Sequence, residues 1–120
     1  MVSHILLQET STSAIPNIMR ERRRLLAPGG ITAHAEIGFF QGLGPYDAFI
    51  IDWDTFNNNE PFWGTLRDMD PVALMRSAGF AAEKVFQARV ARDPGGATVY
   101  SDNIKDSSSR NSWFVIGARK

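Results

Sequence analysis

The sequence has no cysteine, only two histidines, no net charge and no long apolar run. The absence of cysteine excludes disulfides and thiolate metal sites, and two histidines are too few for a metal site to be expected. Lysine plus arginine and aspartate plus glutamate number 13 each, so we expect no general attraction to nucleic acid or to an anionic membrane. The apolar run at the amino end is too short for a signal peptide or a membrane span, and we expect a cytoplasmic protein.

The composition that remains is that of an ordinary globular domain. Hydrophobic residues make up 43% of the chain and charged residues 22%, a balance that argues against disorder. A chain of 120 residues is long enough to bury one hydrophobic core. We therefore expect a single domain over residues 1–120.

The amino-terminal part predicts a strand followed by a helix. The apolar segment from Val2 to Leu7 predicts a short buried strand, which would lie at an open sheet edge because no earlier segment supplies a neighbour. The helix that follows has Thr12 or Ser13 as its expected cap and Pro16 in its first turn. Its apolar residues recur at helical spacing, and they are Ile15, Ile18, Met19, Leu25 and Leu26.

The segment Pro28-Gly29-Gly30 predicts a tight turn into a second strand, since proline cannot continue a helix and glycine tolerates a positive φ. Residues 31–37 alternate between apolar side chains and the polar set Thr32, His34 and Glu36. His34 and Glu36 share one face, and Glu36 is near the carboxyl end of the strand, where ligands gather in open α/β sheets. They are either hydrogen-bonded structural residues or functional ones, and the pattern leaves both readings open.

Most aromatic residues gather between about 38 and 66, a region that we interpret as an irregular lid. Residues 46–57 within it predict a short helix, which the run Asn57-Asn58-Asn59 would end. Aromatic side chains in a long connection either cover the core or line an apolar ligand pocket. Both interpretations stay open for this segment.

The last third predicts a helix and a pair of strands. Asp70 is the expected helix cap, Pro71 the first helical residue and Gly79 the stop, after which Phe80 returns to the core. Strands are expected over 82–90 and 113–118, and a polar loop over about 91–112 is long for a compact domain. These two strands most simply form an antiparallel pair. The order of elements is then β-α-β, lid, α-β-β, with the last strand antiparallel.

Four segments in this order resemble the carboxyl-terminal half of a class I S-adenosylmethionine-dependent methyltransferase. Residues 2–9 look like the fourth strand and its exit loop. Residues 23–30 look like the end of the following helix and its R-x-L-K-P-G-G turn, with Ala27 in place of the usual lysine. Residues 70–80 are similar to the helix that ends in A-G-F, and the final pair to strands six and seven. The resemblance implies an α/β fold that is half of a Rossmann-like sheet.

The resemblance also shows what the chain lacks. The family binds its cofactor mainly through a glycine-rich loop after strand one and an acidic residue after strand two, and neither is present. The segment Gly42-Leu43-Gly44 follows a strand but does not open a convincing helix. S-adenosylmethionine is therefore implied by the resemblance only, and we expect weak or no binding to this chain alone.

The resemblance assigns candidate site residues. Those next to the cofactor, where strand four ends, would be Ser3, His4, Leu7 and Gln8. A catalytic base, where one is needed, would be His4 or Glu36. The methyl-acceptor pocket would be shaped by Trp53, Phe56 and Trp63.

Two functions follow as expectations. The first is a fragment or half of a split methyltransferase, inactive alone, which acts on a small molecule together with a separate amino-terminal half. The second is a non-catalytic, self-associating module derived from a truncated methyltransferase. It would form a homodimer through the exposed strand Val2–Leu7, because an open apolar edge favours pairing.

Overall fold

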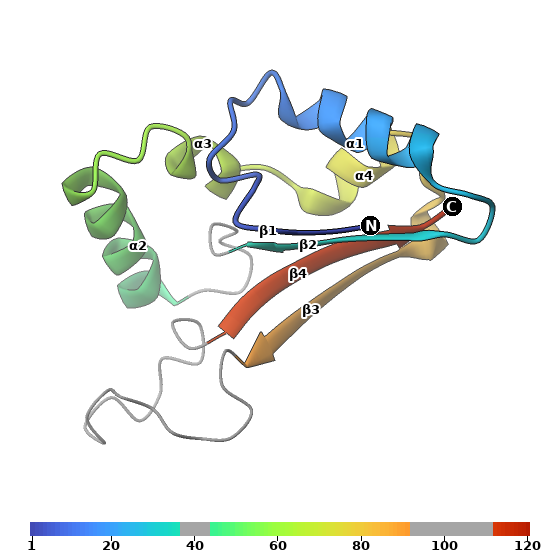
Figure 1. Ribbon diagram of the computed structural model, residues 1–120. Coiled ribbons are helices and arrows are strands. Elements are labelled where there is room, and N and C mark those ends of the chain that lie inside the picture. Colours follow the sequence, from blue (N-terminus) through green and yellow to red (C-terminus); the bar gives the residue numbers. More distant parts are fainter. Residues whose placement is uncertain (37–43, 92–111) are drawn as a thin grey trace.

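A computed structural model describes residues 1–36, 44–91 and 112–120 of the chain. It is a small α/β domain in which a four-stranded sheet carries helices on one face (Figure 1). The strands are β1 (Val2–His4), β2 (Ile31–Glu36), β3 (Val85–Ala91) and β4 (Ser112–Arg119). Within these described ranges, no helix is long and apolar enough to cross a membrane.

The strand order in the sheet is β1-β2-β4-β3. β1 pairs with β2 in parallel, whereas β4 is antiparallel to both of its neighbours, β2 and β3. β1, β2 and β3 thus run in one direction, and β4 is the single reversed strand among them. The expected α/β class and the antiparallel last strand are confirmed.

The prediction of a buried first strand over Val2–Leu7 was wrong in both length and burial. β1 ends at His4, and Val2 is 79% exposed. The strand stops because Ile5 adopts a φ of 56°, which no extended strand allows. Leu7 lies beyond this bend and turns fully into the core.

The first helix, α1 (Ile15–Leu25), differs from its prediction at both ends. Its cap is Ala14, and neither of the expected hydroxyl residues serves as the capping side chain. Pro16 does lie in the first turn, as expected. Leu25 is exposed, whereas Leu26 is buried, because the backbone leaves the helix at Leu26 and extends toward the core.

The glycine turn after α1 is confirmed, and it is tied to the last residue of the chain. Gly29 has a φ of +75°, and a Cβ on Gly30 would lie only 2.9 Å from the Ala27 carbonyl oxygen. The Gly29 amide donates to the Lys120 carbonyl at 3.0 Å, and the Lys120 ammonium donates to the Leu26 carbonyl at 2.6 Å. Lys120 thereby binds a carbonyl group at the end of α1, where a positive charge is favourable.

The helix α4 (Pro71–Ser77) begins and ends at the residues that the sequence predicted. The Asp70 carboxylate accepts hydrogen bonds from the amides of Val72 at 2.8 Å and Ala73 at 3.1 Å. Gly79 ends the segment with a φ of +93°, and Phe80 is buried in the core as expected. A short 3-10 turn, η1 (Ala82–Lys84), then leads into β3, which therefore begins three residues later than predicted.

The region 38–66 is more regular than the predicted lid. The expected helix is confirmed as α2 (Pro45–Asn57), and a second helix, α3 (Trp63–Arg67), was not foreseen. No described side chain of α2 is buried, so this helix does not cover the core. Residues 37–43 and nearly all of the predicted loop 91–112 lie outside the described residues.

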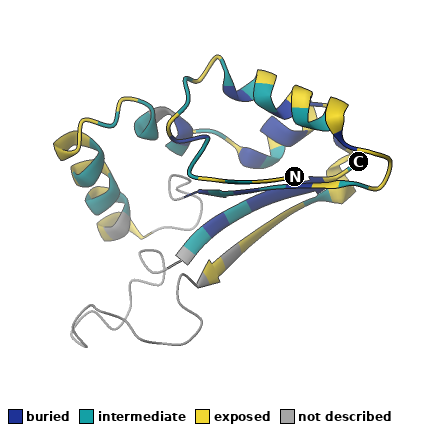
Figure 2. Cartoon of the chain, viewed as in Figure 1, coloured by how far each residue is buried: buried dark blue, intermediate teal, exposed yellow. Residues whose placement is uncertain are grey.

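The core lies between the sheet and the layer formed by α1 and α4, which cover the same face (Figure 2). We name that side of the sheet the inner face and the opposite side the outer face. β2 turns its polar set inward, since Thr32, His34 and Glu36 are all fully buried. By strand register the outer face includes Val2, Ile31, Ala33, Ala35, Phe86 and Val90.

Candidate functional site

The buried polar side of β2 forms a hydrogen-bonded cluster with β1 and α1. The Ser3 Oγ lies 2.7 Å from His34 Nδ1, and the Thr32 Oγ1 lies 3.5 Å from His34 Nε2. Arg22 reaches in from α1, where its Nη1 donates to Thr32 Oγ1 at 3.4 Å. The register places Ser3 directly beside His34. Both ring nitrogens of His34 thus have partners, which is what a buried imidazole requires.

Glu36 holds the backbone of the segment that follows β1. Its Oε1 accepts the amides of Leu6 at 3.2 Å and Leu7 at 3.1 Å, and its Oε2 accepts the amide of Gln8 at 3.4 Å. The bend at Ile5 presents these three consecutive amides to one carboxylate. The carboxylate thereby satisfies backbone donors that would otherwise be buried without partners.

The two buried titratable groups are both driven toward their neutral forms. Burial, followed by the positive charges of Arg22 and the amino terminus, lowers the pKa of His34 from 6.5 to about 3. Burial raises the pKa of Glu36 from 4.5 to about 7, against the amide hydrogen bonds, which lower it. A carboxyl with a pKa near neutrality can exchange protons at physiological pH, which makes Glu36 the strongest acid–base candidate of this cluster.

His4 lies on the opposite side of the sheet from this cluster. It precedes the bend at Ile5 and is exposed on the outer face, where its ring makes an edge contact with Trp113 at a centroid distance of 4.1 Å. The two residues predicted as bases, His4 and Glu36, are therefore not brought together. Their catalytic roles stay predictions.

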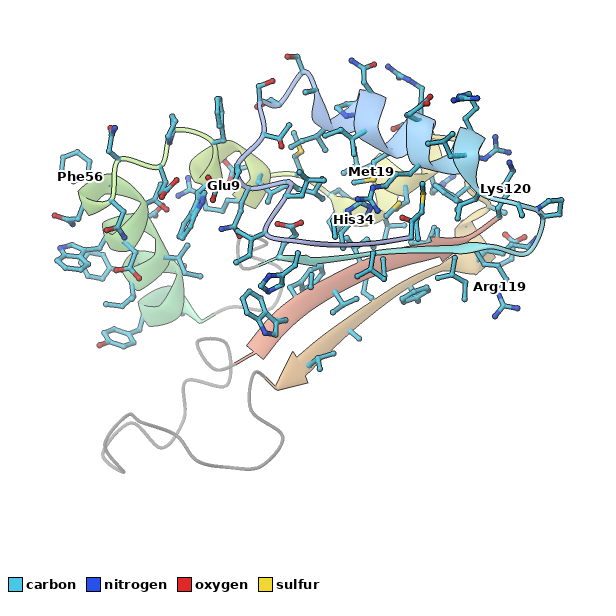
Figure 3. The ribbon with its side chains drawn as sticks, in the orientation of Figure 1. Glu9, Met19, His34, Phe56, Arg119 and Lys120 are labelled. Atoms are coloured by element: carbon cyan, nitrogen blue, oxygen red, sulfur yellow. The ribbon has the colours of Figure 1, made fainter. Side chains whose placement is uncertain are left out.

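Two of the other residues predicted near a cofactor, Leu7 and Gln8, lie beside Glu36. Leu7 and Gln8 are buried, and their amides bind the Glu36 carboxylate. Ser3 belongs to the neighbouring His34 cluster. Figure 3 shows His34 between the sheet and α1, at the level of Met19. The segment after β1 is thus fixed in the fold mostly by hydrogen bonds from its backbone amides to Glu36.

The predicted acceptor residues divide into two groups. Trp63, on α3, donates its indole N–H to Glu9 Oε1 at 3.2 Å, so it lies next to the segment after β1. Trp53 and Phe56, on α2, are exposed, and Phe56 points away from the sheet (Figure 3). α2 and α3 lie beyond the carboxyl ends of β1 and β2 (Figure 1). The Trp63–Glu9 contact joins residues 54 positions apart, which no local sequence signal reveals.

Comparisons with known proteins add no family assignment. No protein-family model matches the sequence, and no curated protein matches it at a significant level. In the part of the chain that the structure describes, no group of three or more metal-ligating side chains comes together. What the site can do must therefore be argued from its own geometry.

Proposed function

We propose that this chain is the carboxyl-terminal half of a class I S-adenosylmethionine-dependent methyltransferase fold, which acts on a small molecule only when a glycine-rich half completes it. The observation that carries the proposal is the strand order β1-β2-β4-β3 with β4 alone reversed. In a doubly wound sheet the fourth, fifth and sixth strands run parallel. The resemblance assigns the final pair to strands six and seven with the last strand antiparallel, and β3 and β4 fit this assignment because β4 alone is reversed.

The position of the polar cluster is consistent with this proposal. Ligands of open α/β sheets bind beyond the carboxyl ends of the strands. Glu36 ends β2 at that edge, and it fixes the backbone of residues 6–8 at the end of β1. Through these amides Glu36 positions the segment after β1, and its raised pKa keeps it the acid–base candidate of the site. Trp63 lies beside the same segment and is the best placed of the proposed acceptor residues.

The described residues do not by themselves fit the whole cofactor. The segment Gly42-Leu43-Gly44 follows β2 and, against the prediction, leads directly into a helix, since Gly44 is the cap residue of α2; Gly42 and Leu43 lie outside the described residues. By the resemblance, however, β1 and β2 correspond to the family's fourth and fifth strands, so the glycine-rich loop after its first strand and the acidic residue after its second have no counterpart here. What this chain supplies is the backbone of residues 6–8 and the aromatic surface of α3. The other half would pair at the edge of β1 opposite β2, where no other described strand lies.

A titration of the isolated chain with S-adenosylmethionine tests the proposal. We expect no micromolar binding by calorimetry. In a spectrum of backbone amides, millimolar cofactor should shift signals of residues 3–9 and leave those of β3 unchanged. Gln8→Ala, which removes a buried side chain beside this backbone, should reduce these shifts in a variant that circular dichroism shows to be folded, whereas Gln87→Ala, at an exposed position of β3, should not.

Two results would contradict the proposal in different ways. Micromolar binding to the isolated chain would show that no second half is needed. Amide shifts that avoid residues 3–9, or that survive Gln8→Ala unchanged, would remove the cofactor from the end of β1. A polypeptide with a glycine-rich strand-end loop, encoded next to this chain and copurifying with it, is the partner that we expect.

A second candidate function, self-association without catalysis, is favoured by a different observation. Several large apolar side chains are exposed on the outer face and on α2, among them Phe49, Phe56, Phe86 and Val90. Exposed apolar surface of this extent is typical of an interaction site. The homodimer through Val2–Leu7 stays a proposal, although only Val2–His4 remains as a strand for it.

A further inference from the structure

The helix α2 has an apolar stripe that nothing in the described chain covers. Phe49, Trp53 and Phe56 follow the helical spacing i, i+4, i+7 and are 59%, 55% and 86% exposed. Among described elements α2 is held mainly by α3, including an ion pair between Asp52 and Arg67. A helix of 13 residues is marginally stable by itself in water, so its stripe needs a surface to contact.

The outer face of the sheet is the second uncovered apolar surface of the same chain. It exposes Val2, Ile31, Phe86 and Val90, and the ring of Phe86 lies across Gly117. The register places no acidic residue on this face, and Arg119 is its one arginine or lysine among the described strand residues. In Figure 3 the Arg119 side chain extends from the sheet away from α1, whereas Lys120 turns toward it. Two of the three strand pairs are antiparallel, and such a sheet can leave one face to water, but a face that exposes several large apolar side chains is typical of an interaction site.

The free edge of β1 is a poorer place for self-association. β1 has three residues, and the positive φ of Ile5 ends the extended backbone. Two such edges paired together would share only about two to four backbone hydrogen bonds. A dimer held by this edge alone would bury little apolar surface.

We propose that the outer face of the sheet binds helix α2 of a second copy of this chain, reciprocally, in a two-fold dimer. The lengths match, because a 13-residue helix and a six-residue strand each span roughly 20 Å. The charges are compatible, since α2 carries three aspartates, of which Asp52 pairs with Arg67, and no lysine or arginine, while the outer face carries Arg119 and no acid among the described strand residues. The inference specifies the surface for the second candidate function above, and it does not depend on methyl transfer.

The area of such a contact suffices for a stable dimer. Covering the exposed parts of the three aromatic side chains of α2 removes roughly 300–500 Å² from solvent, given the size of aromatic residues. The sheet loses about as much, and the two-fold axis doubles the total to roughly 1,200–2,000 Å². This is the range of specific, stable interfaces. The two-fold exchange is also closed, because it occupies the helix and the outer face of both copies at once, so association stops at two.

The mass of the chain in solution, together with two kinds of variant, tests the inference. We expect a dimer by light scattering at micromolar concentration. Trp53→Ser on α2 and Val90→Lys on the outer face should each raise the dimer Kd at least about tenfold, because each disrupts an apolar contact. Leu25→Lys is the matched control, since Leu25 is a similarly exposed apolar residue on α1, away from both surfaces. Circular dichroism checks that every variant is folded.

Mixing the Trp53→Ser and Val90→Lys variants distinguishes the proposed dimer, in which α2 of each copy binds the outer face of the other, from other modes of association. The Val90→Lys copy keeps an intact α2, and the Trp53→Ser copy keeps an intact outer face, so the mixture should form a heterodimer with one good contact. A folded monomeric wild type, or a mixture that stays monomeric, would overturn the inference. A dimer that Ile5→Lys disrupts while Val90→Lys leaves it intact would place the contact at the β1 edge and also overturn it. None of these results bears on cofactor binding at residues 3–9.

Discussion

The substitution Glu36→Gln tests how the buried polar side of β2 is held. Burial raises the pKa of Glu36 from 4.5 in the unfolded chain to about 7 in the folded one. A carboxyl with such a raised pKa contributes stability that is fully present below pH 4.5 and is lost as the pH rises through about 7. At about 1.4 kcal/mol per pKa unit, the loss amounts to roughly 3 kcal/mol.

His34 contributes a pH dependence of the opposite sign. Burial lowers the pKa of His34 from 6.5 to about 3, so its contribution is present above pH 6.5 and is lost as the pH falls through about 3. The same conversion gives roughly 5 kcal/mol. Between pH 4.5 and 6.5 the folded chain thus binds one proton more at Glu36 and one fewer at His34. The wild-type free energy of unfolding should therefore be nearly flat over this interval.

Glu36→Gln removes one of the two opposing dependences. The variant's free energy of unfolding should rise by roughly 3 kcal/mol from pH 4.5 to 6.5, because His34 then acts unopposed. The glutamine oxygen can still accept the amides of Leu6 and Leu7, so the segment after β1 should keep its place. Urea unfolding followed by circular dichroism at a series of pH values measures both curves. Glu83→Gln, an exposed glutamate on η1, is the matched control and should leave the flat interval unchanged.

Parallel pH curves for the wild type and for Glu36→Gln would refute this reasoning. They would mean that Glu36 has the same proton affinity in the folded and unfolded chains, and hence that the three amides fully offset the effect of burial. A wild-type free energy of unfolding that rises steeply between pH 4.5 and 6.5 would also mean that the pKa of Glu36 does not change on folding. A curve that falls over that interval would instead place His34 in contact with solvent.

Two further pairs of substitutions test local features of the fold. Asp70→Ala removes the two capping bonds of α4 and should lower the free energy of unfolding by about 1 kcal/mol, whereas Asp68→Ala, at an exposed ion pair, should change it by less than about 0.5 kcal/mol. Gly117→Ala places a Cβ against the ring of Phe86 and should cost about 1–3 kcal/mol. Gly64→Ala, where a Cβ meets nothing within 4 Å on α3, should stabilise by about 0.5–1 kcal/mol. Urea unfolding measures all four, and equal effects for either pair would contradict the assigned contacts.

Local chemistry made much of the fold predictable from the sequence. Asp70, Pro71 and Gly79 mark the ends of α4 through capping and backbone preference, which depend on neighbouring residues only. The alternation in β2 and the turn at Gly29 are equally local. The predictions failed where the local structure depends on contacts with residues far away in the sequence. β1 is short because its continuation bends to meet Glu36, some thirty residues later in the chain.

The candidate site was predictable in part for the same reason. The pattern placed Glu36 at the carboxyl end of a strand and Leu7 and Gln8 at the end of another, and the fold does join them. It could not show that His4 lies on the other face, since this follows from the pairing of Ser3 with His34. A shift of one residue in that register would exchange the faces of the whole strand. Nor could it show that Trp63 contacts Glu9.

β2 turns its polar side chains toward the core and its apolar side chains toward the outer face, and this links the polar cluster with the proposed docking surface. A strand that buried its apolar residues instead would remove more apolar area from water. β2 does not, because Thr32, His34 and Glu36 each have defined partners on the inner face, which a change of register would break together. The apolar residues are then left on the outer face for a second layer to cover. The register that builds the polar cluster therefore also creates the docking surface, and a substitution that loosens one should weaken the other.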